Sequence, residues 1–268
     1  MVNKALEQGL VAVTGAGSGI GRATALAFAA QGARVLAVDI DGPAAERTAI
    51  ACGPPASARE CDVADWEAVE SLAREVHAEH GPLDVLVNNA GVGMTGRWAD
   101  TSIEDWRWIR SINIDGVVHG CQAFGPAMLA RGAGHIVNLS SGLGYTPRAT
   151  EPAYVTTKAA VLALSQCLRA DWAGHGVGVS VICPGVVNTP IVSACRFLGA
   201  QAEPSVKARA ERIFRRGHRP EAVAEAIVDA VRRNRALVPV GWEAHLGWWG
   251  HRLSPVALQL RLARWSVM

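Results

Sequence analysis

Short apolar runs alternate with longer helix-forming stretches along most of the chain, and this pattern constrains the fold more than any other feature. The apolar runs contain many β-branched residues, as do parallel strands that are buried on both faces of a sheet. Helices that connect such strands cover both faces of the sheet. The pattern therefore predicts an α/β fold with a doubly wound parallel sheet of about seven strands, formed by residues 1–240 as one domain.

The boundaries of these elements follow from the apolar runs and from the helix formers between them. Strands are expected at Leu10–Thr14, Arg34–Asp39, Ala56–Cys61, Leu83–Asn88, His135–Ser140, Val177–Cys183 and Ala236–Val240. Helices are expected at Ile20–Gln31, Pro43–Cys52, Trp66–Glu79, Ile103–Arg131, Ala153–Ala173 and Glu221–Arg233. A sheet of this kind binds its ligands at the carboxyl ends of the strands, so the functional residues should gather there.

A glycine-rich turn follows the first expected strand, with the sequence Thr14-Gly15-Ala16-Gly17-Ser18-Gly19-Ile20-Gly21. An alanine-rich helical segment comes directly after it. Glycines let the backbone approach a ligand, and the free N–H groups at a helix N-terminus attract phosphate. The segment predicts a phosphate-binding turn, and a tight structural turn is the alternative.

Tyr154 and Lys158 lie four residues apart in a segment that begins like a helix after Pro152, so their side chains share one face. Tyrosine ordinarily loses its proton near pH ~10, too high for a base at neutral pH. A neighbouring positive charge favours the phenolate and is expected to lower that pKa. The pair is therefore a candidate acid–base unit, with an ordinary helical pair as the alternative.

These residues and four further motifs resemble the short-chain dehydrogenase/reductase family from about Leu6 to Val240. The motifs are the glycine-rich turn, Asn88-Asn89-Ala90-Gly91, Asn113 within Ser111-Ile112-Asn113-Ile114, Ser141 within Asn138-Leu139-Ser140-Ser141, the Tyr154–Lys158 pair, and Pro184-Gly185-Val186-Val187-Asn188-Thr189. The resemblance implies a Rossmann-like fold and hydride transfer between NAD and a secondary alcohol or ketone.

The resemblance also assigns roles to individual positions. Tyr154 is expected to act as the general acid or base, Lys158 to lower its pKa and hold the nicotinamide ribose, and Ser141 to bind the substrate oxygen. Asn113 is expected to position Lys158, with a locally satisfied, helix-bending asparagine as the alternative. The implied cofactor contacts are Gly15, Ser18, Gly19, Ile20, Gly21, Asp39, Asp62, Val63, Asn89, Ala90, Gly91, Tyr154, Lys158, Pro184, Gly185, Val187 and Thr189.

NAD is favoured over NADP because Asp39 ends the second expected strand. A carboxylate at that place accepts hydrogen bonds from the ribose hydroxyls of NAD and repels the 2′-phosphate of NADP. Ser18 and Ile40 occupy places where NADP-dependent relatives often carry a basic residue. Asp62 is expected to contact the adenine. Capping of a nearby helix is the alternative for both acids, and for Asp62 this is the helix that begins at Trp66.

The substrate is expected to be a hydrophobic secondary alcohol or ketone, held by Ser141, Leu143, Tyr154 and Val186. Other residues expected at the open end of the site are Gly93, Met94, Trp98, Tyr145 and Ile191. Residues 188–219 break the strand–helix alternation and form either a cover over the substrate or a solvated connector. A non-catalytic NAD-binding redox sensor and an NADPH-dependent ketoreductase are the alternative functions.

Composition excludes several other classes of protein. The net charge of +2 gives no reason to expect nucleic acid as a partner. The six cysteines form no Cys-x-x-Cys pair, and no metal-binding motif is present. There is no secretion signal at the N-terminus and no apolar run of the ~20 residues that span a bilayer. These features predict a reduced cytoplasmic protein without a metal.

A homodimer or homotetramer is expected from two helices. Gly116 and Gly120 would allow close helix approach, and the expected helix Ala153–Ala173 carries a stripe of Val161, Leu162, Leu164 and Leu168. Residues 241–268 form an extension that holds four of the nine tryptophans, with a helix expected after Ser254-Pro255. Subunit packing or a lid over the substrate is favoured for this basic extension, and weak contact with a membrane surface is the alternative.

Overall fold

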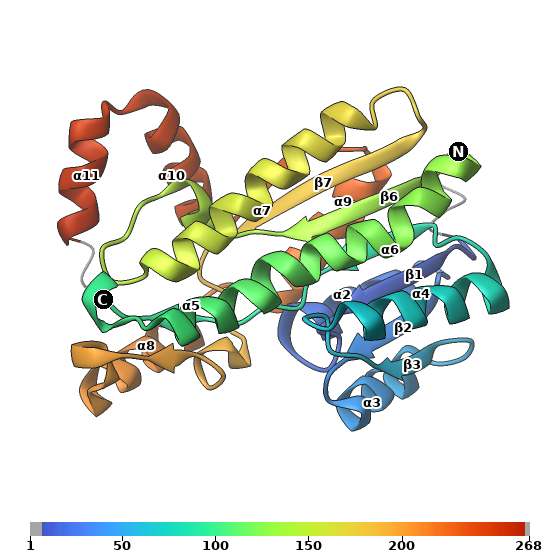
Figure 1. Ribbon diagram of the computed structural model, residues 1–268, viewed down its shortest axis with the longest axis horizontal. Coiled ribbons are helices and arrows are strands. Elements are labelled where there is room, and N and C mark those ends of the chain that lie inside the picture. Colours follow the sequence, from blue (N-terminus) through green and yellow to red (C-terminus); the bar gives the residue numbers. More distant parts are fainter. Residues whose placement is uncertain (1–6, 266–268) are drawn as a thin grey trace.

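The computed structural model describes residues 7–265, and seven strands form one parallel sheet in the order β3-β2-β1-β4-β6-β7-β9 (Figure 1). The chain adds strands toward one edge of the sheet from β1 to β3 and toward the other edge from β4 onward. This change of direction between β1 and β4 leaves a crevice beyond the carboxyl ends of those two strands. The strands are β1 (Leu10–Thr14), β2 (Arg34–Asp39), β3 (Ser57–Glu60), β4 (Val85–Asn88), β6 (Gly134–Leu139), β7 (Val177–Pro184) and β9 (Leu237–Val240).

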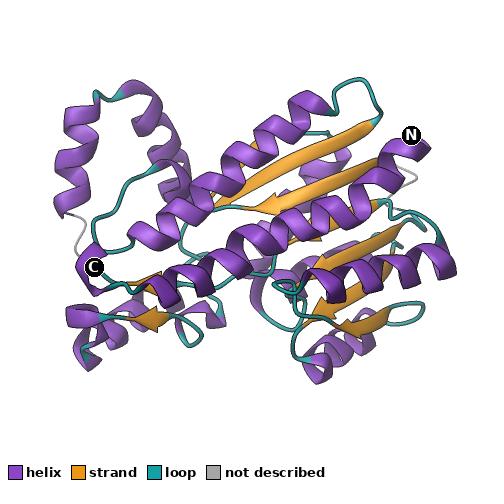
Figure 2. Ribbon diagram, viewed as in Figure 1, coloured by secondary structure: helices purple, strands orange, loops and turns teal. Residues whose placement is uncertain are grey.

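Helices cover both faces of the sheet (Figure 2). One core cluster joins α2 (Gly19–Ala29), α3 (Gly42–Cys52) and α9 (Pro220–Arg232) to the sheet, and its fully buried side chains include Phe28 and Ile227. The other joins α4 (Trp66–His80), α6 (Gly116–Arg131) and α7 (Pro152–Asp171), around Phe124 and Met128. Each large apolar side chain buried in this way stabilises the fold by about 2 kcal/mol.

The structure confirms the predicted fold class, and all seven predicted strands are present within two residues of their predicted ends. One predicted helix is interrupted. The stretch from Ile103 to Arg131 consists of α5 (Ile103–Arg110), a π-helical turn at Ser111–Asp115, and α6. A π-helical turn inserts one extra residue and is often found at functional sites. Asn113 lies inside this turn.

Several elements near the carboxyl edge of the sheet were not predicted. Two short strands, β5 (Met94–Thr95) and β8 (Arg196–Phe197), pair in parallel outside the main sheet. The segment after β7 contains α8 (Pro204–Arg215), and the short 3₁₀ turn Gly142–Tyr145 follows β6. These elements stand beside the crevice rather than in the sheet.

Two helices follow the last strand: α10 (Trp242–Leu253) and α11 (Val256–Trp265), which extend to the side of the sheet in Figure 1. The helix predicted after Ser254-Pro255 is present as α11, whereas α10 was not predicted. Tyr145 donates a hydrogen bond from its hydroxyl to the carbonyl of Ala244 at 2.6 Å, and its ring lies edge-on to Trp248. These contacts hold α10 against the 3₁₀ turn that follows β6.

Candidate active site

One cavity of about 720 Å³ runs along the carboxyl ends of the central strands. It begins at the glycine-rich turn and passes the Asp39 and Asp62 side chains. It ends at Ser141, Tyr154 and Lys158, where residues of the 189–214 segment and of α10 form its outer wall. Cavities of this size bind nucleotides and other small molecules in many proteins.

The glycine-rich turn presents the N-terminus of α2 to the cavity. Gly15, Ser18, Gly19 and Ile20 all line it. Gly19 has a φ of +51°, which a residue with a side chain rarely adopts, so glycine is required at this position. The first turn of α2 has no side-chain cap and no acidic residue, so its N–H groups and helix dipole are available to a phosphate.

Gly21 was predicted to contact the cofactor, but it does not line the cavity. A Cβ atom at Gly21 would overlap the carbonyl oxygen of Gly15 and lie 2.5 Å from Nδ2 of Asn89. Glycine is needed here because α2 packs directly on the turn. Asn89 completes this packing by donating from Nδ2 to the carbonyl of Thr14 at 2.8 Å, and the Thr14 hydroxyl accepts from the Asn89 and Ala90 amides.

Asp39 and Asp62 both line the cavity, and neither caps a helix. Asp39 accepts from the amide of Gly17 at 2.7 Å through Oδ2 and from the amide of Asp41 at 3.0 Å through Oδ1. The N-cap of α3 is Asp41, and the N-cap of α4 is Asp65. The capping alternative is therefore wrong for both acids. Each oxygen of Asp39 retains capacity for a further donor, because a carboxylate oxygen accepts about two hydrogen bonds.

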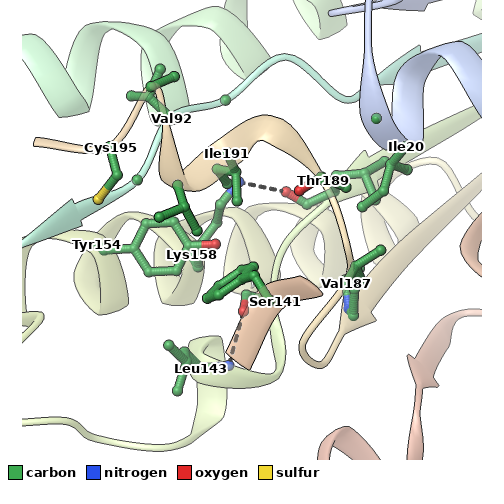
Figure 3. Close-up of a pocket in the computed structure, with 18 of the residues that line it drawn as sticks. Ile20, Val92, Ser141, Leu143, Tyr154, Lys158, Val187, Thr189, Ile191 and Cys195 are labelled. Atoms are coloured by element: carbon green, nitrogen blue, oxygen red, sulfur yellow. Dashed lines mark hydrogen bonds between the residues drawn. The ribbon is translucent and has the colours of Figure 1, made fainter. Parts of the chain in front are cut away.

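Ser141, Tyr154 and Lys158 converge at the inner end of the cavity (Figure 3). Ser141 follows β6, and its hydroxyl accepts from the amide of Leu143 at 3.1 Å. Lys158 donates from Nζ to the carbonyl of Leu139 at 3.0 Å, and Nζ lies 5.9 Å from the centre of the Tyr154 ring. The helix that begins at Pro152 thus brings the phenol and the ammonium to one place, as their spacing predicts.

The pKa values of this pair differ from the sequence-based expectation. Burial raises the pKa of Tyr154 to about 12, opposed by an interaction with the Ser141 hydroxyl and assisted by the negative charge of Glu151. Burial also lowers the pKa of Lys158 to about 8. The expected lowering of the tyrosine pKa by Lys158 is not present in the protein alone, where removal of the phenol from water is the largest effect on this pKa.

Asn113 does not line the cavity or hydrogen-bond Lys158. Its side chain accepts from the amide of Val92 at 2.8 Å and donates to the carbonyl of Val92 at 3.0 Å. Val92 lines the cavity directly after Asn89-Ala90-Gly91. The π-helical turn thus aims Asn113 at the backbone that borders the cavity. Its amide also donates to the Thr157 hydroxyl at 3.2 Å, one residue before Lys158.

The remaining predicted contacts divide into two groups. Those confirmed as cavity-lining, beyond the residues already described, are Val63, Asn89, Ala90, Gly91, Gly93, Met94, Leu143, Pro184, Gly185, Val186, Val187, Thr189 and Ile191. Two predictions are wrong. Trp98 lies on the surface and does not line the cavity, and Tyr145 is buried with its hydroxyl directed to Ala244.

Sequence reasoning missed several polar residues that line the cavity, among them Arg148, Glu151, Cys195 and Glu243. Glu151 lies three residues before Tyr154, so helical spacing could have identified it. No motif or residue spacing in the sequence marks Glu243 as a site residue. Its carboxylate accepts from His218 at 2.8 Å and from the amide of Val186 at 3.1 Å, so it connects α10 to the loop after β7.

The 189–214 segment lines the cavity with side chains that include Pro190, Ile191 and Phe214, so it covers the site rather than serving as a solvated connector. Within residues 7–265, no group of three or more His, Cys, Asp or Glu side chains is arranged to hold a metal ion. No helix in the same part of the chain has the length and apolar character to cross a membrane.

Residues 9–196 match the model of the short chain dehydrogenase family. A short chain dehydrogenase/reductase from Burkholderia phymatum in complex with NAD superposes with a TM-score of 0.84 and 31% identity, over 96% of each chain. Together with the cavity described above, these matches define the class of protein. The chain belongs to the short-chain dehydrogenase/reductase family.

Two curated relatives illustrate the range of the family. A probable oxidoreductase, EphD, from Mycobacterium tuberculosis is 45% identical over 93% of this chain and 44% of its own length. The chain thus spans less than half the length of this relative. A galactitol 2-dehydrogenase (L-tagatose-forming) from Cereibacter sphaeroides is 41% identical over 71% of this chain and 76% of its own length.

Proposed function

We propose that the protein oxidises a secondary alcohol to a ketone with NAD, using Tyr154 as the general base. The observation that carries this proposal is the continuity of one cavity from the glycine-rich turn to Ser141, Tyr154 and Lys158. The uncapped N-terminus of α2, the glycine at Gly19 and the acceptor oxygens of Asp39 fit a dinucleotide. When bound, NAD supplies the nicotinamide ring that accepts a hydride from the alcohol carbon.

The protein's own residues supply position and proton transfer. The Tyr154 phenolate takes the proton of the substrate hydroxyl and becomes the neutral phenol, and the Ser141 hydroxyl holds the same oxygen by a hydrogen bond. Lys158 places a positive charge near the phenol. Bringing the Tyr154 pKa down from about 12 requires further positive charge in the cavity, which a cationic cofactor ring supplies. Asn113 acts indirectly, by holding the Val92 backbone at the edge of the cavity.

A panel of secondary alcohols, diols and sugar alcohols assayed with NAD tests this function by the rise of nicotinamide absorbance. The galactitol 2-dehydrogenase relative supports the choice of sugar alcohols. NAD binding without turnover of any alcohol, or of the corresponding ketones with NADH, would leave the redox-sensor alternative. Turnover of ketones with NADPH alone would favour the ketoreductase.

We expect NAD to bind at least about 30-fold more tightly than NADP, which corresponds to roughly 2 kcal/mol. The reason is that a 2′-phosphate would lie against the Asp39 carboxylate, where like charges repel. Dissociation constants from calorimetry measure the preference. The double variant Asp39→Ser, Ile40→Arg should reverse it, because it removes the acid and adds a phosphate partner at an exposed position. Equal affinities of the natural protein for both cofactors would contradict the assignment.

The proposal includes a homodimer or homotetramer, although the predicted contact surface needs correction. A Cβ atom at Gly116 would meet Val63, and one at Gly120 would overlap Asn88, so both glycines face the protein's own interior. Val161, Leu164 and Leu168 likewise pack into the core of the same chain. Exposed large apolar side chains occur at scattered positions such as Ile50 and Trp98, but they are concentrated on α10 and α11, and those on the two helices include Trp242, Leu246, Trp249, Leu253, Leu258, Leu260 and Leu262.

Deletion of the residues after Val240 should weaken the oligomer and raise KM for the alcohol while leaving the Kd for NAD within about threefold. This expectation combines the exposed apolar surface of α10 and α11 with the place of α10 in the cavity wall. Light scattering, steady-state kinetics and cofactor titration measure the three quantities. Sedimentation of the full chain with anionic vesicles, lost on truncation, would favour the membrane alternative. Unchanged oligomer, kinetics and vesicle binding would defeat both.

The cytoplasm is the proposed location. The six cysteines are all free in the structure, as a reducing compartment requires.

A further inference from the structure

Most side chains at the substrate end of the cavity are apolar, among them Met94, Leu143 and Phe214. Arg148 and Glu151 are charged residues in this apolar surrounding, and their side chains are 22% and 7% exposed. Nη1 of Arg148 donates to Oε1 of Glu151 at 3.1 Å. Both lie near the reacting end of the cavity, since their charges act on the pKa of Tyr154, three residues after Glu151.

The pair is not fully satisfied by protein groups. Within residues 7–265, the bond between Arg148 and Glu151 is the one hydrogen bond that either side chain makes. A guanidinium has five N–H donors, and a carboxylate has a second oxygen with its own acceptor sites. Glu243 and Lys158, also charged and lining the cavity, differ in this respect, because Glu243 is held by His218 and Val186, and Lys158 by Leu139.

A structural role does not account for the pair. Glu151 is the N-cap residue of α7, but its side chain makes no capping bond to the helix. Removing two charges from water is costly, and well-packed apolar residues often stabilise a fold as well or better. An ion pair with a buried carboxylate, a partly buried guanidinium and unused donors and acceptors that faces a cavity is suited to binding a polar group of a ligand.

The chemistry of the pair selects among ligand groups. A ligand carboxylate would be attracted to Arg148 and repelled by Glu151. A ligand ammonium would be attracted to Glu151 and repelled by Arg148. A hydroxyl group both donates and accepts, so it can donate to Glu151 and accept from Arg148 at the same time. Because Glu151 is the N-cap of α7, three residues before Tyr154, and both line the same cavity, this hydroxyl would be close to the carbon that is oxidised.

We infer that Arg148 and Glu151 form a subsite for a second hydroxyl group, so that the substrates are diols or other polyhydroxy compounds with two hydroxyls on neighbouring or nearly neighbouring carbons. This inference rests on the proposed alcohol oxidation and narrows its substrate class. It differs from the sequence-based expectation of a hydrophobic secondary alcohol or ketone. The apolar remainder of the cavity accommodates the carbon skeleton.

The test compares matched alcohols with NAD: butane-2,3-diol against butan-2-ol, and cyclohexane-1,2-diol against cyclohexanol. The natural protein should show a kcat/KM at least ~10-fold higher for each diol, as expected for hydrogen bonds to charged groups. The double variant Arg148→Leu, Glu151→Leu should reduce this ratio to about 1–3, because it removes both partners and leaves no unpaired charge. Glu151→Gln, which keeps the shape and an acceptor, should give an intermediate ratio.

A matched control removes a pair of the same composition and spacing outside the cavity. Glu104 and Arg107 form an exposed i,i+3 ion pair on α5, 3.4 Å apart. The variant Glu104→Leu, Arg107→Leu should retain the diol preference. Quenching of tryptophan fluorescence by NAD reports whether each variant keeps its fold and its cofactor site.

The outcomes separate the subsite from the function on which it rests. Equal kcat/KM values of the natural protein for diol and mono-alcohol overturn the subsite, as does a diol preference that survives in the Arg148→Leu, Glu151→Leu variant; alcohol oxidation itself would stand in both cases. Binding of NAD by the natural protein without oxidation of any of these alcohols or of the wider panel overturns the proposed function, and the subsite with it.

Discussion

Tyr154→Phe is expected to lower kcat for alcohol oxidation by at least ~10²-fold while leaving the Kd for NAD nearly unchanged. The substitution removes the only atom of the side chain that can take the substrate proton, and it keeps the ring that packs beside Met94, Ile109 and Ala153. Steady-state kinetics and a cofactor titration on the same preparation measure both quantities. Substantial turnover by the variant at neutral pH would remove Tyr154 from the mechanism.

Tyr145→Phe is the matched control, since the chain contains only these two tyrosines. Tyr145 is buried, and its hydroxyl donates to Ala244 rather than facing the cavity. Its loss removes one hydrogen bond that holds α10, so we expect a kcat reduced by less than tenfold and a higher KM.

The high pKa of Tyr154 predicts that the oxidation rate of the natural protein rises as the pH is raised from 7 to 9.

Lys158→Met is expected to abolish most turnover and, in the absence of NAD, to stabilise the protein by about 2 kcal/mol at pH 7. Burial lowers the pKa of Lys158 from 10.5 to about 8, so the protonated lysine opposes folding by about 3 kcal/mol. Methionine fills a similar volume without charge. The hydrogen bond to the Leu139 carbonyl is lost, which costs about 1 kcal/mol and leaves the stated net gain.

The pH dependence of this stabilisation has a definite sign. Below pH 8 the lysine is protonated in both the folded and the unfolded protein, and the variant keeps its full advantage. Between pH 8 and 10.5 the folded protein releases the proton before the unfolded chain does, so the natural protein gains stability and the advantage shrinks. At pH 9.5 the remaining penalty of about 1 kcal/mol is close to the cost of the lost hydrogen bond, and the two proteins should be nearly equal.

Urea unfolding at pH 7 and pH 9.5 measures these differences. Lys207→Met is the control, because Lys207 is exposed on α8 and its removal should change stability by less than about 0.5 kcal/mol at either pH. A Lys158→Met protein no more stable than the natural one at pH 7 would show that burial does not penalise the ammonium. The result would also show whether the lysine is retained at a cost in stability, as functional groups often are.

The parts of the structure that sequence could predict are those that depend on local pattern. Apolar strand runs and the glycine-rich turn specify a parallel sheet with a glycine turn at the N-terminus of α2, regardless of what packs around them. The i,i+4 spacing of Tyr154 and Lys158 likewise fixes their common face once the helix begins at Pro152. The resemblance to a family then assigns expected roles to residues whose function the sequence pattern alone does not determine.

The parts that sequence did not predict depend on contacts between distant segments. The π-helical turn at Ser111–Asp115 has no clear composition signal, and it directs Asn113 to Val92. From sequence alone, Gly116 and Gly120 are equally consistent with a contact surface between subunits and with close packing against Val63 and Asn88. Only the three-dimensional fold shows that they pack against Val63 and Asn88. The lowered pKa of Lys158 also depends on burial, which arises from the complete cavity rather than from neighbours in sequence.

The cavity is lined by two parts of the molecule whose sequences can change at different rates during evolution. Its cofactor end is formed by turns that emerge directly from the sheet, where glycines and tight hydrogen bonds leave little freedom. Its other end is bordered by the 189–214 segment and by α10, which lie outside the main sheet; α10 is held through Tyr145 and Glu243, and the segment through the pairing of β8 with β5. Exchange of these outer segments between related chains would therefore be a practical route to new substrate ranges, with the dinucleotide site inherited unchanged.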